Sequence, residues 1–232
     1  MTASLYIHIP FCASKCDYCD FFSIRTDSNS DSSLLDAYIR ALLDDIKEQI
    51  DFFNINCMPS IYIGGGTPSV LGALRMQFFL SGLKSVLGAL FKTVGEFTIE
   101  ANPESADEAF FSVCKSQGVN RISLGIQSFY EKSLHAAGRK CSQSLKEKSL
   151  ALANSYFPGA FSVDLISGLP FQTASVVLSD INRSLDFSPA HISLYSLTLD
   201  AQSPLGKKFP GLLGDNADRL WIKGRNALEN AG

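Results

Sequence analysis

The sequence has little surplus charge of either sign. Its 20 Lys and Arg residues stand against 23 Asp and Glu residues, for a formal net charge of -3. Binding to a nucleic-acid backbone depends on a surplus of basic side chains, so we expect nucleic acid to be excluded as the main partner. Charged residues are only 19% of the chain and apolar residues are 46%. These fractions exclude a disordered or coiled-coil protein and indicate a globular one.

Long uninterrupted apolar runs are also missing. A membrane-spanning helix needs about 18 consecutive apolar residues. The most apolar stretch, residues 78–94, is interrupted by Ser81, Lys84, Ser85 and Lys92. The first residues contain neither the basic n-region nor the apolar h-region of a secretion signal. We therefore expect a cytoplasmic protein with no transmembrane segment and an amphipathic helix in this stretch.

Cysteine is scarce, with six residues in 232. This number is too small for a disulfide scaffold. Three of them, Cys12, Cys16 and Cys19, follow one another at C-x3-C-x2-C spacing, and such groups of thiolates hold zinc or iron. Structural zinc usually has four protein ligands, and no fourth Cys or His follows at finger-like spacing. Three ligands on an iron–sulfur cluster would leave one iron open, which indicates a reactive site. The other cysteines are expected to be small buried apolar residues: Cys57, Cys114 and Cys141.

Short strand-like runs alternate with helical patterns along the whole chain. The runs are apolar or β-branched and bounded by Gly, Pro or Asn, and they predict strands at residues 5–9, 60–64, 97–101, 121–127, 161–166 and 191–197. Three- and four-residue apolar spacing predicts helices at residues 33–53, 73–91, 106–117, 143–156, 175–187 and 215–230. Six β-α units in series favour an α/β fold with a parallel sheet.

Each predicted strand has one apolar face and one polar face. In the strand at residues 161–166, for example, Phe161, Val163 and Leu165 alternate with Ser162 and Asp164. A doubly wound sheet would be apolar on both faces, because helices cover both. The pattern therefore favours a partial (β/α)6 TIM-like barrel with parallel strands around a polar lumen. An antiparallel sheet with one wet face would alternate in the same way, but the intervening helices make this the weaker interpretation.

Several motifs together resemble the radical S-adenosylmethionine (SAM) enzymes. The cysteine loop follows the first strand, Gly64-Gly65-Gly66-Thr67-Pro68 follows the second, and Glu100 closes the third. Four further stretches resemble the oxygen-independent coproporphyrinogen III oxidase family, which includes the HemW-type heme chaperones: residues 6–12, 125–129, 138–139 and 164–170. The resemblance runs from residue 6 to about residue 198. It implies one radical SAM core domain over residues 1–232, with the cluster loop at residues 10–27.

The resemblance also implies a cofactor site. Cys12, Cys16 and Cys19 would ligate a [4Fe-4S] cluster, whose open iron binds SAM and whose electron cleaves it to a 5'-deoxyadenosyl radical. The residues matching family contacts to SAM are Tyr6, Tyr18, Gly65, Gly66, Thr67 and Glu100. Those matching a second SAM molecule are Gln127, Arg139, Asp164 and Thr198. From the residues alone, the glycine run also fits a tight turn, and the two carboxylates also fit lumen groups neutralised by Arg121 or Arg139.

The sequence departs from the family pattern at two places, and the first of them separates the branches of the family. In the oxidases a further cysteine stands two residues after the third, whereas Asp20-Phe21 follow Cys19 here, as in the chaperone branch. Cys141 stands where relatives commonly have His. We therefore expect a HemW-like heme chaperone with heme as its cargo, a flavodoxin or ferredoxin as electron donor, and a heme-acceptor protein as partner. The alternatives are a coproporphyrinogen III oxidase and a degenerate or zinc-binding structural barrel.

The sequence ends at Gly232. In the chaperones, a His-Asn-x-x-Tyr-Trp heme motif and a C-terminal domain come after this point. The resemblance therefore predicts a radical SAM core without the family's C-terminal domain.

Overall fold

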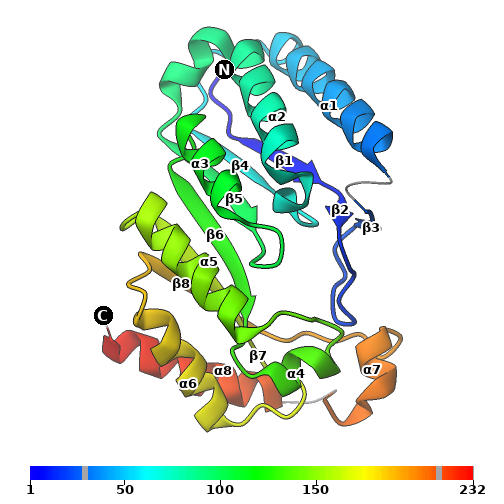
Figure 1. Ribbon diagram of the computed structural model, residues 1–232, viewed down its shortest axis with the longest axis vertical. Coiled ribbons are helices and arrows are strands. Elements are labelled where there is room, and N and C mark those ends of the chain that lie inside the picture. Colours follow the sequence, from blue (N-terminus) through cyan, green and yellow to red (C-terminus); the bar gives the residue numbers. More distant parts are fainter. Residues whose placement is uncertain (28–30, 213–215, 232) are drawn as a thin grey trace. The chain divides into compact units, whose positions relative to one another are not determined.

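Six strands follow one another in the order β1-β4-β5-β6-β7-β8 in a computed structural model that describes residues 1–27, 31–212 and 216–231 (Figure 1). The strands are β1 (Leu5–Ile9), β4 (Ser60–Gly65), β5 (Glu96–Ala101), β6 (Arg121–Gln127), β7 (Phe161–Ser167) and β8 (His191–Ser196). The pairings of β1 with β4, β4 with β5, and β7 with β8 are all parallel. The predicted α/β class and its six strands are thereby confirmed, each strand to within one residue at either end.

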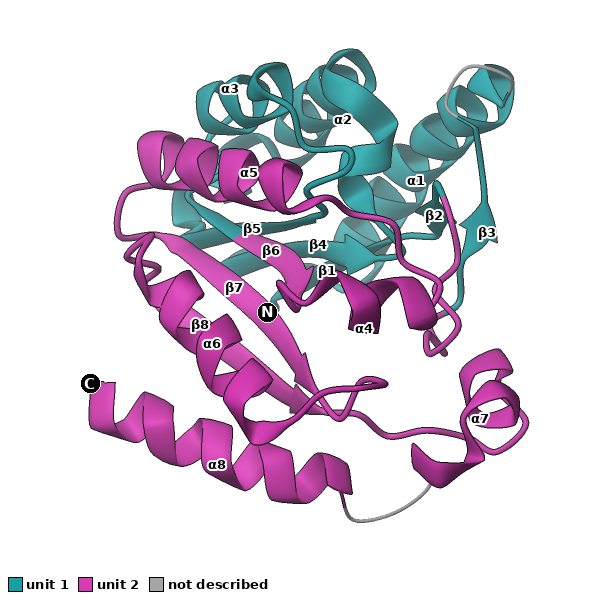
Figure 2. Cartoon of the chain, turned by 60° about the horizontal axis from the view of Figure 1, so that its bottom comes forward, with its two compact units in different colours: residues 1–13, 22–122 teal, residues 14–21, 123–232 magenta. Residues whose placement is uncertain are grey.

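The chain divides into two units, coloured teal and magenta in Figure 2. Unit 1 comprises residues 1–13 and 22–122, and unit 2 comprises residues 14–21 and 123–232. Unit 1 also contains a small parallel sheet of β2 (Phe11–Cys12) and β3 (Ile24–Arg25). The sequence did not predict these strands, because two residues are too few to show a period.

Helices separate the strands as expected. In unit 1 they are α1 (Ser32–Phe52), the 3-10 helix η1 (Pro68–Leu71), α2 (Gly72–Leu87), η2 (Gly88–Thr93) and α3 (Glu108–Ser116). In unit 2 they are α4 (Glu131–Ala136), α5 (Gln143–Tyr156), α6 (Ala174–Leu185), α7 (Pro204–Lys208), η3 (Pro210–Leu212) and α8 (Asn216–Ala231). The helix predicted over residues 73–91 is shorter, because Gly88 has φ 52° and ends α2. Asp215, the predicted start of the last helix, lies outside the described residues.

One helical stretch, Pro68–Thr93, is long and apolar enough to cross a membrane by length and composition alone. It spans η1, α2 and η2. Within α2, Met76, Phe79, Leu80 and Leu83 are fully buried. A core helix passes the same test, so this one stretch is weak evidence for a membrane span.

The core of unit 1 lies on the predicted apolar face of its strands. Ile7 pairs with Ile63 and Ile63 pairs with Ile99, and all three side chains are buried. On the other face, Tyr6 is aligned with Tyr62, and Tyr62 with Thr98. The strand parity read from the sequence thus separates the core from the polar face.

In unit 2 the polar face is enclosed and hydrogen-bonded. Ser123 on β6 lies 2.8 Å from the Ser162 hydroxyl on β7 and donates to the Asp164 carboxylate at 2.9 Å. Both serines are buried. The polar parity of these strands therefore marks an internal hydrogen-bond network.

Candidate cluster and cofactor site

Cys12 lies at the end of β2 in unit 1, against the glycine loop. Its Sγ is 3.5 Å from the Thr67 hydroxyl. The Gly66 N–H donates to the Ile9 carbonyl at 2.8 Å, and the Thr67 N–H donates to the Phe11 carbonyl at 2.7 Å. The loop after β4 is thereby fixed beside the first cysteine of the motif.

Glycine is required at positions 65 and 66, because the loop approaches neighbouring atoms closely there. A Cβ at Gly66 would lie 2.6 Å from the Phe11 carbonyl oxygen and 3.0 Å from Cys12 Sγ. Gly65 has φ 113°, and a Cβ there would lie 2.7 Å from the His8 ring. Only glycine avoids both penalties. The glycine run therefore does form a tight turn, as one interpretation of the sequence proposed. The predicted SAM contacts of Gly65 and Gly66 stay predictions.

Glu100, near the end of β5, accepts a hydrogen bond from the Tyr62 hydroxyl at 2.6 Å. A Cβ at Gly64 would lie 2.9 Å from the Glu100 carboxylate. Tyr6 stacks on Tyr62 with 6.1 Å between ring centroids, and 58% of Tyr6 is exposed. These residues make a polar surface, on the face of the strands opposite the core, where a ligand can contact a carboxylate and an aromatic ring.

The sequence analysis missed Asn102. Its side-chain amide donates to Thr67 Oγ1 at 3.0 Å, and its backbone N–H donates to Ser69 Oγ at 3.1 Å. Asn102 therefore fixes the end of the glycine loop through hydrogen bonds to Thr67 and Ser69. The available signal was a polar residue directly after a strand in an α/β fold, where functional side chains gather.

Cys16 and Cys19 lie in unit 2, in a short loop held by backbone hydrogen bonds. The Cys19 N–H donates to the Cys16 carbonyl at 3.1 Å. The Asp17 N–H donates to the Ala137 carbonyl at 3.0 Å, and the Asp17 carbonyl accepts from Leu205 at 3.1 Å. The ends of α4 and α7 thus position the loop that carries these two cysteines.

Tyr18 and Arg139 tie this loop to β6. The Tyr18 side chain hydrogen-bonds with both Arg139 and Cys16, and burial raises the pKa of its hydroxyl although the Arg139 charge opposes the shift. Arg139 is only 4% exposed and donates to the Gly125 carbonyl at 2.7 Å. The structure thus gives Arg139 a supporting role behind the cysteine loop, and its predicted contact with a second SAM stays a prediction.

The other residues predicted to bind a second SAM molecule differ in exposure. Asp164 is half-buried and accepts from Ser123, Gln127 is half-buried at the end of β6, and Thr198 is exposed beyond the end of β8. Gln127 has φ 67°. The Ser128 N–H donates to the Ile126 carbonyl at 2.8 Å, so Gln127 is the central residue of a γ-turn, a strained conformation. Such strain occurs most often at functional sites.

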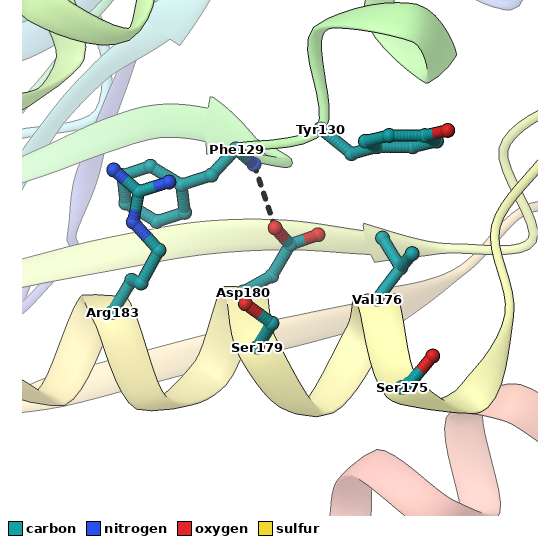
Figure 3. Close-up of a pocket in the computed structure, with 7 residues that line it drawn as sticks. All are labelled: Phe129, Tyr130, Ser175, Val176, Ser179, Asp180 and Arg183. Carbon is teal, nitrogen blue, oxygen red and sulfur yellow. Dashed lines mark hydrogen bonds between the residues drawn. The ribbon is translucent and has the colours of Figure 1, made fainter.

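A pocket beside this turn was not anticipated from the sequence (Figure 3). Asp180 on α6 is 3% exposed and accepts from the Ser128 hydroxyl at 2.5 Å and the Phe129 N–H at 2.7 Å. Burial raises the pKa of Asp180 to about 6, while these two hydrogen bonds and the charges of Lys146 and Arg183 act in the opposite direction. The Arg183 guanidinium lies over the Phe129 ring, 4.6 Å from its centroid. Asp180 thereby anchors the segment that follows Gln127.

The three motif cysteines suit an iron–sulfur cluster in their chemistry. None of the three forms a disulfide in the described part of the chain, and all three are half-buried. Gly66 lies against Cys12, and a Cβ there would make a tight contact with Sγ at 3.0 Å. Among the described residues, no three His, Cys, Asp or Glu side chains form a preassembled metal group. The three cysteines therefore supply the sulfur donors that an iron–sulfur cluster needs. Their arrangement around such a cluster stays a prediction.

The remaining cysteines are partly as expected. Cys114 and Cys141 are buried, which confirms the prediction for both. Cys57 is half-exposed, so the prediction of burial is wrong there. Cys57 itself forms an isolated parallel bridge with Thr2, near the exposed N-terminus.

A parallel α/β sheet, with a three-cysteine loop after its first strand and a glycine loop after the next strand in the sheet, defines a class of cluster-binding α/β proteins. The family model described as "Radical SAM superfamily" matches residues 6–182, and the chain belongs to this superfamily. Membership implies a [4Fe-4S] cluster and S-adenosylmethionine as cofactors.

Individual relatives show which members of the superfamily this chain resembles. The chain is 36% identical over 218 residues to the heme chaperone HemW of Escherichia coli, covering 94% of this chain and 56% of that protein. It is 31% identical over 235 residues to the mitochondrial radical S-adenosyl methionine domain-containing protein 1 of Mus musculus, covering 99% of this chain and 52% of that protein. The chain thus spans about half the length of these relatives.

Solved structures show the same fold. The coproporphyrinogen III oxidase HemN of Escherichia coli, a radical SAM enzyme, superposes with a TM-score of 0.79 at 23% identity, over 96% of this chain and 50% of that one. At this identity the likeness concerns the fold alone. It confirms the predicted partial-barrel fold of the radical SAM type.

Proposed function

We propose that this chain is the radical SAM core of a HemW-type heme chaperone. The observation that carries the proposal is 36% identity to HemW over nearly the whole chain, together with Asp20-Phe21 after the cysteine motif. Residues 1–232 act as one core domain, with the cluster loop at residues 10–27. The setting is the cytoplasm.

In this proposal Cys12, Cys16 and Cys19 hold the [4Fe-4S] cluster. When bound, the cluster supplies the electron that cleaves SAM reductively. The contact between Thr67 and Cys12 supports a role for Thr67 in setting the position of that sulfur atom. The hydrogen bond from Arg139 to Tyr18 supports a matching role for Tyr18 beside Cys16.

The glycine loop would hold SAM. The narrow approach at Gly65 and Gly66 lets backbone groups face the methionine part of SAM, and Glu100 accepts hydrogen bonds from its hydroxyl or amino groups. Tyr6, which is exposed beside Tyr62, packs on the adenosyl part. Gln127, Arg139, Asp164 and Thr198 would hold a second SAM molecule.

Heme is the cargo, a flavodoxin or ferredoxin supplies the electron, and a heme-acceptor protein takes the cargo. The heme cargo follows from the HemW relatives, which are heme chaperones, and the electron donor from the requirement of radical SAM proteins for a reductant.

Anaerobic reconstitution with iron and sulfide, followed by EPR of the reduced protein, tests the cofactor site. We expect a cluster signal that shifts on adding SAM and that is lost in Cys16→Ala. Cys57→Ala is the matched control, because Cys57 is half-exposed but outside the motif. No cluster signal in the wild-type chain, or an undiminished signal in Cys16→Ala, would overturn the proposal. Stoichiometric zinc without iron would instead support the structural-barrel alternative.

The family resemblance leaves one alternative, a coproporphyrinogen III oxidase. Incubation of the reconstituted protein with SAM, reductant and coproporphyrinogen III separates the two. Decarboxylated porphyrinogen in the product would favour the oxidase, and binding of heme without turnover favours the chaperone.

A further inference from the structure

A row of two phenylalanine rings and two lysines lies on the surface of unit 2. Lys132 Nζ on α4 is 4.3 Å from the centroid of the Phe171 ring. Phe171 meets Phe209 edge to face, with 5.7 Å between centroids, and Lys208 Nζ is 5.5 Å from the Phe209 centroid. We call these four residues the aromatic row. Phe171 is 49% exposed, both lysines are exposed, and no carboxylate of the described residues forms an ion pair with either lysine.

Phe171 occupies a backbone position that suits glycine. The Gln172 N–H donates to the Leu169 carbonyl at 3.1 Å, which closes a β-turn with Pro170 and Phe171 at its centre. Phe171 has φ 63°, as the third position of a type II turn requires. Glycine adopts this conformation without penalty, whereas a bulky side chain is a real outlier. The strain is not offset by burial, because half of the residue is exposed.

The surrounding loop holds Phe171 in that conformation. The Gln172 side chain accepts from the N–H groups of Gly168 and Leu169 at 2.8 and 2.9 Å and donates to the Ile166 carbonyl at 3.0 Å. The Ser133 hydroxyl donates to the Pro170 carbonyl at 2.6 Å. A strained residue that is held firmly and presented to solvent is a feature of ligand sites.

The aromatic row also adjoins the loop of Cys16 and Cys19. Phe209 and Tyr18 both pack against one buried cluster of Leu134, Ala137, Leu169 and Leu205. Lys208 Nζ donates to the Ala136 carbonyl at 3.1 Å, next to Ala137, which holds Asp17. The row therefore stands on the same part of unit 2 that positions two of the motif cysteines.

We propose that the aromatic row is the docking surface for the flat tetrapyrrole cargo, which stacks on one phenylalanine ring and meets the perpendicular second ring at its edge, while Lys132 and Lys208 pair with its carboxylates. Two adjacent aromatic rings favour a planar apolar ligand, and an ammonium group beside each ring favours one with two negative groups. This proposal rests on the proposed heme-chaperone function, because heme is such a ligand.

Phe171→Gly gives the sharpest test. This substitution removes the ring and relieves the backbone strain at position 171. If Phe171 served only folding, the variant protein would be less stable than the wild type; if it serves binding, stability would be retained. We expect the melting temperature of Phe171→Gly to equal or exceed that of the wild type, and its Kd for protoporphyrin IX to rise about tenfold. Phe171→Trp should retain wild-type binding. Fluorescence titration of the full chain with protoporphyrin IX measures the affinity.

The lysines are tested with a ligand whose carboxylates are blocked. Lys132→Ala and Lys208→Ala should each weaken binding of protoporphyrin IX several-fold, and should leave binding of its dimethyl ester unchanged. Lys148→Ala, an exposed lysine on α5 outside the row, is the matched control. Phe52→Ala, an exposed phenylalanine at the end of α1, is the control for loss of a surface ring.

The outcomes separate this proposal from the proposed function. Wild-type affinity in Phe171→Gly, with an intact cluster EPR signal, would overturn the row as the docking surface and leave the chaperone function standing. No binding of protoporphyrin IX by a wild-type chain that carries its cluster would overturn both the docking surface and the heme cargo. Binding of anionic lipid vesicles that Phe171→Gly abolishes, with porphyrin binding unchanged, would assign the row to a membrane instead.

Discussion

Arg139 illustrates how one buried side chain can support a loop that carries two cysteines. Its guanidinium group hydrogen-bonds with Tyr18 and donates to the Gly125 carbonyl, so it needs two donor directions at once. Lysine carries the same charge but lacks the planar fork. The geometry of this residue, more than its charge, fixes Tyr18 beside Cys16.

We expect Arg139→Lys to lower the iron content of reconstituted protein by about half or more, because the loop around Cys16 loses the contact that holds Tyr18. Iron per chain and the EPR signal measure the effect. Arg219→Lys, on the exposed surface of α8, is the control. Full iron content in Arg139→Lys would show that the loop does not need the fork.

Asp180 is unusual because burial raises the pKa of its carboxyl to about 6, from 3.8. The folded state therefore binds its proton more tightly than the unfolded state does. The stability that this group contributes is complete below about pH 4 and is lost as the pH rises through about 6. The total is about 3 kcal/mol for a shift of this size.

Asp180→Asn should abolish this pH dependence while keeping a hydrogen bond to the Phe129 N–H. We expect the difference in free energy of unfolding, wild type minus Asp180→Asn, to fall by about 2 to 3 kcal/mol between pH 4 and pH 7. Urea unfolding at several pH values gives the measurement. A difference that stays constant or rises with pH would contradict the raised pKa.

Among the elements, the strands were predicted well because each has a two-residue alternation bounded by turn residues. The short helices α4 and α7 were missed, since five or six residues do not complete two turns and show no apolar period. The division of residues 73–91 at Gly88 was also missed. A glycine within an apolar helical pattern is tolerated, and only the backbone shows that φ is positive there.

In the loop between β4 and η1, we make a prediction for the single methyl group that Gly66→Ala would add. In Gly66→Ala the new Cβ would lie 2.6 Å from the Phe11 carbonyl, in a contact that backbone atoms must relieve. We expect a loss of about 1 to 3 kcal/mol in unfolding free energy, together with reduced cluster content because Cys12 shifts. In Gly211→Ala the Cβ would meet nothing within 4 Å, so this variant is the control. A Gly66→Ala protein as stable as the control would contradict the close approach.

For the whole chain, cluster binding should be coupled to folding. A ligand that binds only the folded state raises its stability by an amount set by concentration and affinity. We expect the reconstituted protein to melt several degrees higher than the apoprotein, and the increase to disappear in the triple variant Cys12→Ala/Cys16→Ala/Cys19→Ala. Anaerobic differential scanning calorimetry tests this. An equal increase in the triple variant would place the stabilising iron elsewhere.

The sequence alone determined the α/β class, the six strands and their buried faces, because strand parity and helix periodicity are local patterns. It also indicated the cysteine loop and the radical SAM likeness, since motif spacing is read directly from the chain. The tertiary structure decided what depends on distant residues meeting in space. It gave Asn102 and Arg139 their supporting contacts, buried Asp180 so that its pKa rises, and brought Lys132, Phe171, Phe209 and Lys208 into one row from α4, the loop after β7 and the end of α7. No local pattern encodes such contacts, because each depends on how separate elements pack.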